Sequence, residues 1–303
     1  MSSYGHFRFQ FRSLWIASRR FRRIRKRLGF LCSAAVPILA AFLRLRLLSR
    51  RGRFLSSHPI NGTQLKLILL SYARPANVDL LVRLCCIDSV DRIVVSNNNP
   101  RYRVRDIVRV RDPRLVLIDQ EDHVKPGIRF VLARDEPSDL YIAIDDDVFL
   151  TPSQLRLLAE KLAAEPENPH GLIGKVLRGK SFPPWPFVPA DPHDMARVDI
   201  LNCVYAFTRE HLDEYFRLAA AVGIEDHAQF GNGEDIILSF SGRERPRIHD
   251  FGPVTVCASS SLAGIAVSST HDHFYKERWE LFSSLSAIKL FERTCNNTRT
   301  GTI

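Results

Sequence analysis

The chain has 303 residues, of which 45% are hydrophobic and 25% are charged, as expected for one globular domain with an appended segment. Its net charge of +10 is unevenly distributed. Residues 1–53 contain 14 of the 43 Lys and Arg residues and none of the 33 Asp and Glu residues, so the rest carries 29 basic side chains and a net charge of −4. A mildly acidic body lacks the basic surface of a nucleic-acid binder, and no nucleic-acid partner is expected.

The basic N-terminal tail encloses a short hydrophobic segment. "SRRFRRIRKR" (18–27) precedes "LGFLCSAAVPILAAFL" (28–43), and "RLRLLSRRGR" (44–53) follows. Extended to residue 48, the segment 28–48 approaches the roughly 20 residues that span a bilayer. We therefore expect a tail over 1–60 that binds a membrane surface through residues 1–53, as an anchor or an interfacial helix, and a folded domain over 61–303. A disordered basic extension is the alternative.

From residue 64 onward, apolar runs alternate with helical patterns. Strands are predicted at 66–70, 92–95, 114–118 and 140–144, and helices at 76–86 and 126–135. The run "LYIAI" (140–144) is continuously apolar, which is typical of a strand buried on both faces of a parallel sheet. This order predicts an α/β, Rossmann-like domain with a mostly parallel central sheet flanked by helices.

The second half of the chain is less regular. Thr151, Pro152 and Gln154 predict a helix start with a capping box. Further on come the apolar runs 171–176 and 198–207 around a Pro-rich aromatic loop (181–192), a helix from Thr208 towards Gly223, the segment 231–240 and a final mixed segment. Six cysteines without CxxC spacing predict no zinc site, and Cys85 and Cys86 are expected to be buried thiols.

Three consecutive aspartates, Asp145 to Asp147, follow the fourth predicted strand. In open α/β sheets this is the edge at which ligands bind. Because alternate residues of an extended chain face the same side, Asp145 and Asp147 can converge on one target while Asp146 points away. Two such carboxylates suit Mg²⁺ or Mn²⁺, particularly a cation shared with a diphosphate, and the cation offsets their repulsion. A solvated Asp-rich turn is the alternative.

A second acidic group occurs in "GNGEDIILSF" (231–240). Glu234 and Asp235 begin an amphipathic segment, and on spacing alone Asn232 is its N-cap. The helix start would also keep Asp235 ionised, as a base or nucleophile requires.

A third candidate region is "THDHFYKERW" (270–279). His271 and His273 are either a metal pair or surface residues. Arg278 could neutralise a departing diphosphate or form a peripheral salt bridge.

In this order, the segments over 65–285 resemble the exostosin-type glycosyltransferases (glycosyltransferase family 64), which have a GT-A fold. The matching segments are "LSYARPANV" (the family's first strand and turn), "IVVSNNNP" ("VVWNN"), "PGIRFV" ("NRF"), "AIDDDVFL" ("AIDDDI"), "NGEDIILSF" ("NCEDIAMNF") and "THDHFYKERWE" ("THMVERSEC"). The resemblance implies transfer of a sugar, an N-acetylhexosamine or related hexose, from a UDP-sugar to a glycan or other hydroxyl acceptor. It also implies retention of anomeric configuration and Mn²⁺, or Mg²⁺, as cofactor.

The resemblance also assigns roles to individual residues. The implied donor-binding residues are Arg74, Asn97, Asn98, Arg129, Asp145 and Asp146. The implied metal ligands are Asp147 and Asp145, and the implied catalytic residues are Asp235, beside the anomeric carbon, and Arg278, facing the diphosphate. Asn232 and Glu234 would lie near the acceptor or transferred sugar. Trp185, on the aromatic loop, would stack on an acceptor sugar or would instead cover the core.

Two departures from the family pattern bear on compartment and donor. Gly233 and Leu281 stand where the family has two cysteines, so both halves of a disulfide are absent, which favours a reducing compartment. We therefore expect a membrane-associated protein whose domain faces the cytoplasm; the alternative is a single-pass Golgi-type protein with a luminal domain. "LNCVYAF" replaces the family's "LTGAAF", with Cys203 and Val204 in place of Thr and Gly, which leaves the donor sugar open.

Two other functions would use similar residues. A nucleotidyltransferase also combines an α/β nucleotide site with carboxylates and Mg²⁺, but "SYARPANV" has neither glycine nor lysine for a phosphate loop. A catalytically inactive member that binds sugar nucleotide or glycan is the other alternative, against which stand the intact metal and Asp235 positions.

Overall fold

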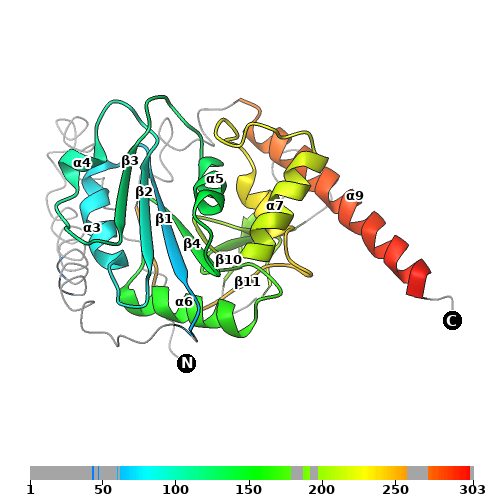
Figure 1. Ribbon diagram of the computed structural model, residues 1–303. Coiled ribbons are helices and arrows are strands. Elements are labelled where there is room, and N and C mark those ends of the chain that lie inside the picture. Colours follow the sequence, from blue (N-terminus) through cyan, green and yellow to red (C-terminus); the bar gives the residue numbers. More distant parts are fainter. Residues whose placement is uncertain are drawn as a thin grey trace, which may run out of the picture.

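A computed structural model describes residues 43, 47, 60, 62–178, 187–191, 197–257 and 272–300, with side chains to residue 294 (Figure 1). Nearly all of the predicted segment 28–48 therefore lies outside the described residues, as do Trp185 and His271. Within the described part of the chain, no helix combines the length and the apolar character that crossing a bilayer requires.

The central sheet has seven strands in the order β11-β6-β10-β4-β1-β2-β3. Its parallel part consists of β1 (Leu65–Ser71), β2 (Arg92–Asn97), β3 (Leu115–Asp119) and β4 (Leu140–Asp145). Beyond β4 lie β10 (Val204–Thr208) and β6 (His170–Gly171), paired antiparallel, and β11 (Arg247–Ile248), parallel to β6. The predicted α/β fold with a mostly parallel sheet is confirmed.

Helices cover both faces of this sheet because β1 and β4 are apolar on both sides. One core contains Leu67 and Ile142 and packs against α3 (Pro75–Cys85), α4 (Val104–Ile107) and α6 (Pro152–Ala164). The other contains Ile68 and Ala143 and packs against α5 (Ile128–Asp135), α7 (Arg209–Ala221) and α8 (Glu234–Ser239). The continuous apolar pattern of 140–144 predicted this two-sided burial. Cys85 and Cys86 are buried in the first core, as expected.

Two small sheets and a long helix complete the domain. β5 (Val148–Phe149) pairs with β12 (Thr255–Val256), and β7 (Gly174–Leu177) pairs with β8 (Phe187–Pro189) and β9 (Ile200–Leu201). Helix α9 (Phe274–Thr300) buries Leu285 in the second core, and its C-terminal half projects away from the body (Figure 1). The sequence pattern predicted only a mixed segment here.

The predicted helix starts have mixed outcomes. Thr151 and Gln154 form the predicted capping box of α6, and Thr208 caps α7 through a second box. The prediction that Asn232 caps the next helix is wrong: α8 begins after Gly233, which has a φ of 120° and makes no side-chain cap. All six residues of α8 are buried, so the segment is also not amphipathic, because α9 covers the side that would otherwise face solvent.

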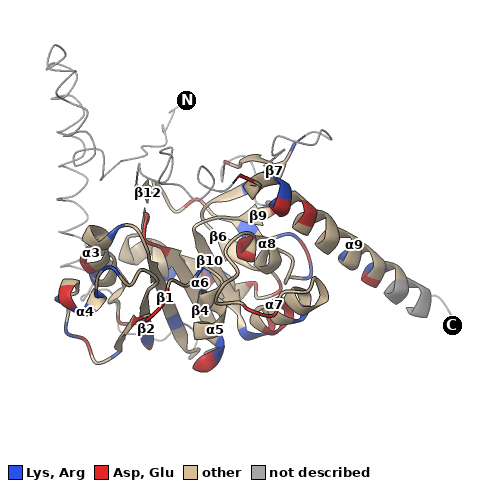
Figure 2. Ribbon diagram, turned by 90° about the horizontal axis from the view of Figure 1, so that it is seen from above, with Lys and Arg blue, Asp and Glu red and all other residues tan. Residues whose placement is uncertain are grey.

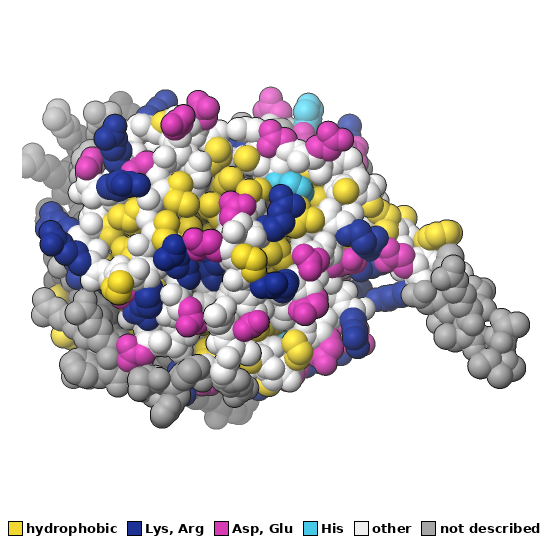
Figure 3. Space-filling view, in the orientation of Figure 1, with side chains coloured by type: hydrophobic (Ala, Val, Ile, Leu, Met, Phe, Trp, Pro, Cys, Tyr) yellow, Lys and Arg dark blue, Asp and Glu magenta, His cyan; other side chains and the backbone are white. Residues whose placement is uncertain are grey.

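Figure 2 shows basic and acidic residues interspersed over the described elements, so in this view neither positive nor negative charge dominates. In the view of Figure 3, apolar side chains lie on the surface among pairs of Lys or Arg and Asp or Glu side chains.

Candidate functional site

The strand order reverses between β1 and β4, which are adjacent and parallel. The chain leaves β1 at Ser71 and enters α3 at Pro75, and it leaves β4 at Asp145. In doubly wound sheets such a reversal separates the two flanking loops and forms the crevice in which ligands bind. The three aspartates therefore stand at this crevice.

Asp146 connects the end of β4 to the loop between β1 and α3. Its Oδ2 accepts hydrogen bonds from the backbone N–H groups of Tyr72, Ala73 and Arg74 at 2.9, 3.2 and 3.2 Å. Its Oδ1 accepts one from Arg74 Nη1 at 2.5 Å, and its carbonyl accepts one from Asn77. The Asp146 side chain thus faces the β1–α3 loop, where it shares Arg74 with Asp147.

Asp145 and Asp147 converge with Cys203: one ligand atom from each of the three lies within 4.8 Å of the others. Asp147 Oδ1 is buried without a hydrogen-bond partner, while Asp147 Oδ2 lies 3.3 Å from Arg74 Nη2. Burial raises the pKa of Asp147 to about 7, against the effect of Arg74, and the adjacent carboxylates add to the rise. A buried orphan carboxylate oxygen beside two more donor atoms fits a divalent cation, which would supply the missing partner.

Arg129 links the first aspartate to the second acidic group. It is 2% exposed, donates from Nη2 to Asp145 Oδ1 at 2.7 Å, and lies 3.7 Å from Glu234 Oε1. Its guanidinium carbon is 4.8 Å from the centre of the Tyr205 ring, and its buried Nη1 has no hydrogen-bond partner. Burial raises the pKa of Glu234 to about 7, and the neighbouring Asp235 adds to this, while Arg129 opposes it.

Asp235 and Arg278 form a buried bidentate ion pair, with Arg278 Nη1 and Nη2 at 2.8 and 2.7 Å from the two carboxylate oxygens. The N–H of Ile236 also donates to Asp235 Oδ1 at 2.9 Å. This pair joins α8 to α9 across 43 residues of chain. Arg278 therefore faces the Asp235 carboxylate in this conformation, and a substrate that reaches Asp235 must share or displace the guanidinium.

Asn97 and Asn98 are buried at the ends of β1, β2 and β3, where they hold the strand termini together. Asn97 Nδ2 lies 3.3 Å from Asp119 Oδ1, and Asn97 Oδ1 accepts a hydrogen bond from the Asn99 N–H at 3.1 Å. Asn98 accepts one from Ser96 Oγ at 2.8 Å, and its own N–H donates to the Ser71 carbonyl. These contacts place the two asparagines in the hydrogen-bonded strand ends on the β2 side of β1.

The remaining predicted residues lie around α9. Asn232 Nδ2 donates to Glu277 Oε2 at 2.8 Å and to the Phe274 carbonyl at 3.1 Å, so it binds the start of α9. On the aromatic loop, Phe187 is buried, with its ring centre 4.9 Å from that of Phe282, as a cover over the core would require.

Two residues near the site were not singled out from the sequence. Lys175, on β7, lies close enough to Arg278 and Asp235 for both to affect it: burial and Arg278 lower the pKa of Lys175, and Asp235 raises it. A lysine inside the apolar "GLIGKV" was the available signal. Tyr72, directly after β1, is 41% exposed with its ring centre 4.7 Å from that of His123, and no pattern in the sequence marked it.

Gly233 and Leu281, 48 positions apart, are direct neighbours. A Cβ placed on Gly233 would lie 2.4 Å from Leu281 Cδ2. The leucine side chain thus fills the space beside the glycine, and the two positions where the family resemblance places a disulfide do face each other.

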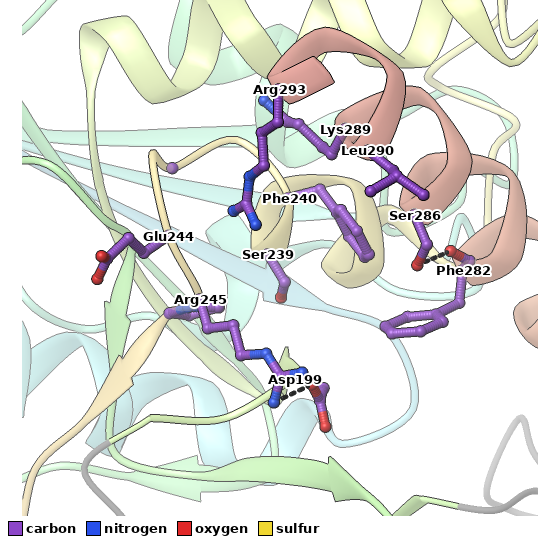
Figure 4. A pocket seen from close by; sticks show the side chains of 12 residues that line it. Asp199, Ser239, Phe240, Glu244, Arg245, Phe282, Ser286, Lys289, Leu290 and Arg293 are labelled. Atoms are coloured by element: carbon purple, nitrogen blue, oxygen red, sulfur yellow. Dashed lines mark hydrogen bonds and ion pairs between the residues drawn. The ribbon is translucent and has the colours of Figure 1, made fainter. Parts of the chain in front are cut away.

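A cavity of about 320 Å³ lies outside the aspartate site, between α9 and the segment that follows α8 (Figure 4). Its walls include Phe240, Phe282 and Leu290, and its rim carries Arg245, paired with Asp199 at 2.9 Å. None of the predicted site residues lines it.

Comparison with known proteins supplies no family assignment. No protein-family profile matches the chain, and no curated protein sequence is detectably similar to it. Among solved structures, the mannosyltransferase PcManGT from Pyrobaculum calidifontis in complex with GDP-Man and Mn²⁺ aligns at 12% identity and a TM-score of 0.46, over 85% of this chain and 82% of that one.

Two further solved structures are similar over part of the chain. GalNAc-T7 with UDP, GalNAc and Mn²⁺ aligns at 10% identity and a TM-score of 0.47, over 64% of this chain and 43% of that one, so the alignment spans less than half of GalNAc-T7. CMP:2-keto-3-deoxy-manno-octonic acid synthetase complexed with CTP aligns at 15% identity and a TM-score of 0.35, over 51% of this chain and 78% of that one. At TM-scores below 0.5, these likenesses assign no function to the chain.

Proposed function

We propose that the chain is a metal-dependent glycosyltransferase of the GT-A type that uses a nucleotide-sugar donor. The observation that carries the proposal is the convergence of Asp145 and Asp147 at the strand-order reversal, with a buried carboxylate oxygen that has no partner. The strand-order reversal is where doubly wound sheets bind ligands, and carboxylate oxygens are suitable ligands for a divalent cation that also binds a nucleoside diphosphate.

In this proposal Asp147 and Asp145 hold Mn²⁺ or Mg²⁺, and the cation, when bound, neutralises charge on the leaving diphosphate. Arg74 faces the same crevice and is held there by Asp146, so it is positioned to bind the donor. Arg129 fixes Asp145 on the nucleoside side. Lys175 adds a second basic side chain near Asp235, beside Arg278.

Asp235 is the residue that we place beside the anomeric carbon. Arg278 and the Ile236 N–H fix the orientation of its carboxylate, which is the preorganisation that a group stabilising a developing positive charge needs. Donor binding would draw Arg278 towards the diphosphate and release one carboxylate oxygen. Glu234, with its raised pKa, can donate or accept a hydrogen bond at a sugar hydroxyl, and Asn232 lies beside it.

The finer assignment rests on the exostosin resemblance. The direct contact of Gly233 and Leu281 supports it, because the resemblance pairs these two positions. On this basis we propose a UDP-sugar donor, with N-acetylhexosamine or a related hexose transferred with retention to a glycan or other hydroxyl acceptor.

One observation favours a second candidate function, a catalytically inactive protein that binds sugar nucleotide. Arg278 donates a hydrogen bond to each oxygen of Asp235, so in this conformation the guanidinium shields the carboxylate from a substrate. If Arg278 does not move, nucleotide can bind at the aspartates but the sugar is not transferred.

The test is a panel of UDP- and GDP-sugars with Mn²⁺, in which release of nucleoside diphosphate is measured for the wild type, Asp147→Ala and Asp235→Ala. We expect Mn²⁺-stimulated release with at least one donor. Asp147→Ala should lose it together with donor binding, whereas Asp235→Ala should keep donor binding and lose turnover. Wild-type donor binding without turnover would support the inactive binder. An anomeric NMR spectrum showing a β-linked product from an α-linked donor would refute retention.

A further inference from the structure

Cys203 occupies an unusual backbone position beside the aspartates. Of the non-glycine residues in the described ranges, it is the one with a positive φ, 63°, in the turn between β9 and β10. Its N–H donates to Tyr205 Oη at 2.9 Å, and its carbonyl accepts a hydrogen bond from the Asp145 N–H at 3.0 Å. The turn is thereby fixed to the first aspartate, which holds the Cys203 backbone beside the carboxylates.

The thiol completes a set of three ligand atoms. Cys203 Sγ and one oxygen each from Asp145 and Asp147 lie within 4.8 Å of one another, a spacing that one ion between them can bridge. Asp147 is 7% exposed, and its Oδ1 is buried without a hydrogen-bond partner. This orphan oxygen is an independent sign that a positive group is expected between the three side chains.

Two arginines already contact the carboxylates of this three-residue group. Arg129 contacts Asp145 through Nη2, and Arg74 lies on Asp147 Oδ2. Burial, together with Asp147 and Asp145, raises the pKa of the Cys203 thiol, and Lys175 only opposes this, so a bound cation has to supply the charge that stabilises the thiolate.

We propose that Cys203 is a third protein ligand, as a thiolate, to the cation held by Asp145 and Asp147. The inference rests on the proposed function only in assigning a divalent cation to these two carboxylates. Ligation breaks the S–H bond, forms a sulfur–metal bond and releases the proton to solvent, without a redox change. Because thiolates prefer softer cations, the site binds Zn²⁺ and Cd²⁺ more tightly than two carboxylates alone would.

The test uses the full chain without nucleotide and Cd²⁺ as the probe. Wild type, Cys203→Ser and a control, Cys85→Ala, at the C-terminal end of α3 in the first core, are titrated while the ultraviolet sulfur-to-cadmium charge-transfer absorption is recorded. We expect Cys203→Ser to lose one equivalent of this absorption and to bind Cd²⁺ at least about tenfold more weakly, since loss of an outer-sphere partner alone costs about 10- to 100-fold. Cys85→Ala should retain both.

A second measurement needs no cysteine variant. The wild-type chain is alkylated with and without Cd²⁺, and the modified cysteines are mapped by peptide mass spectrometry. Cd²⁺ should protect Cys203 in the wild type and not in Asp147→Asn. Unchanged alkylation of Cys203 at saturating Cd²⁺, or equal Cd²⁺ absorption and affinity in Cys203→Ser, would overturn the proposal.

The outcome is separable from that of the proposed function. The cadmium titration is made without nucleotide, so it reports on the three ligand atoms whether or not the site binds a nucleotide sugar. If the wild type binds Cd²⁺ through Cys203 but no nucleotide sugar with any cation, the ligand assignment holds and the proposed function fails.

Discussion

Asp145, Asp146 and Asp147 are adjacent in the chain, yet each meets a different environment. Asp145 contacts Arg129, Asp146 accepts four hydrogen bonds from the β1–α3 loop, and Asp147 retains an oxygen without a partner. Three like charges in a row are tolerated because Arg129 pairs with Asp145, and Arg74 pairs with both Asp146 and Asp147. Asp147 is the one that still has a buried oxygen to offer a ligand.

At the same scale, the Asp235–Arg278 pair makes a stability prediction. Asp235→Asn leaves the guanidinium buried with a neutral partner, and breaking a buried pair in this way lowers the free energy of unfolding by about 3–5 kcal/mol. Urea unfolding measures it. The matched control is Glu160→Gln, whose partner Arg156 is 36% exposed, for which the loss should stay below about 1 kcal/mol.

The double variant Asp235→Asn with Arg278→Gln should recover part of the loss, because no buried charge then remains. Equal losses for Asp235→Asn and Glu160→Gln would mean that the pair contributes nothing beyond a surface ion pair.

At the scale of elements, local patterns predicted the half of the site that is built from consecutive strands. The apolar run of β4 and the aspartates after it identified the sheet edge, and Thr151 with Gln154 located the start of α6. The contact of Asp235 with Arg278 joins two helices far apart in the chain, and neither helix encodes it locally. Cys203 also escaped prediction as a site residue, because its position depends on a positive-φ turn fixed to β4.

The packing of α8 against α9 makes a second prediction, at Gly233. An alanine there meets two obstacles, a φ of 120° and the Leu281 side chain at 2.4 Å from the new Cβ. Gly223 is the control, since its φ of 78° is also unfavourable for alanine but no atom lies within 4 Å.

In thermal or urea unfolding, Gly223→Ala should cost about 1–2 kcal/mol, the usual penalty of a left-handed conformation. Gly233→Ala should cost about 1–3 kcal/mol more, the range for overpacking a core. Equal costs at the two positions would contradict the close α8–α9 contact.

For the molecule as a whole, a buried histidine links stability to pH. His170 is fully buried, with Nδ1 3.0 Å from His249 Nε2, and burial, together with His249 and Arg247, lowers the pKa of His170 from 6.5 to about 3. Below pH 6.5, His170 therefore binds a proton in the unfolded chain but not in the folded chain, so the free energy of unfolding falls as the pH falls. Asp147 and Glu234, with pKa values raised to about 7, act in the opposite direction in an overlapping window.

Because these effects overlap, the contribution of His170 is measured as the difference in unfolding free energy between the wild type and His170→Gln. Between pH 6.5 and pH 5, His170 should remove about 2 kcal/mol of stability from the wild type, a loss absent from His170→Gln. Urea unfolding of both proteins across this pH range gives the comparison. Parallel pH dependences for the two proteins would show that His170 does not stay neutral in the fold.

The proposed function requires the residues at the ends of β1 and β4 to bind a nucleoside diphosphate through a divalent cation. Isothermal titration of UDP into the full chain, with and without Mn²⁺, measures this binding, with Asp147→Asn and the exposed Asp213→Asn on α7 as a matched pair of variants. We predict binding that requires Mn²⁺, persists in Asp213→Asn and is at least about tenfold weaker in Asp147→Asn. UDP binding of the same strength without Mn²⁺, or in Asp147→Asn, would refute a cation-dependent nucleotide site at these aspartates.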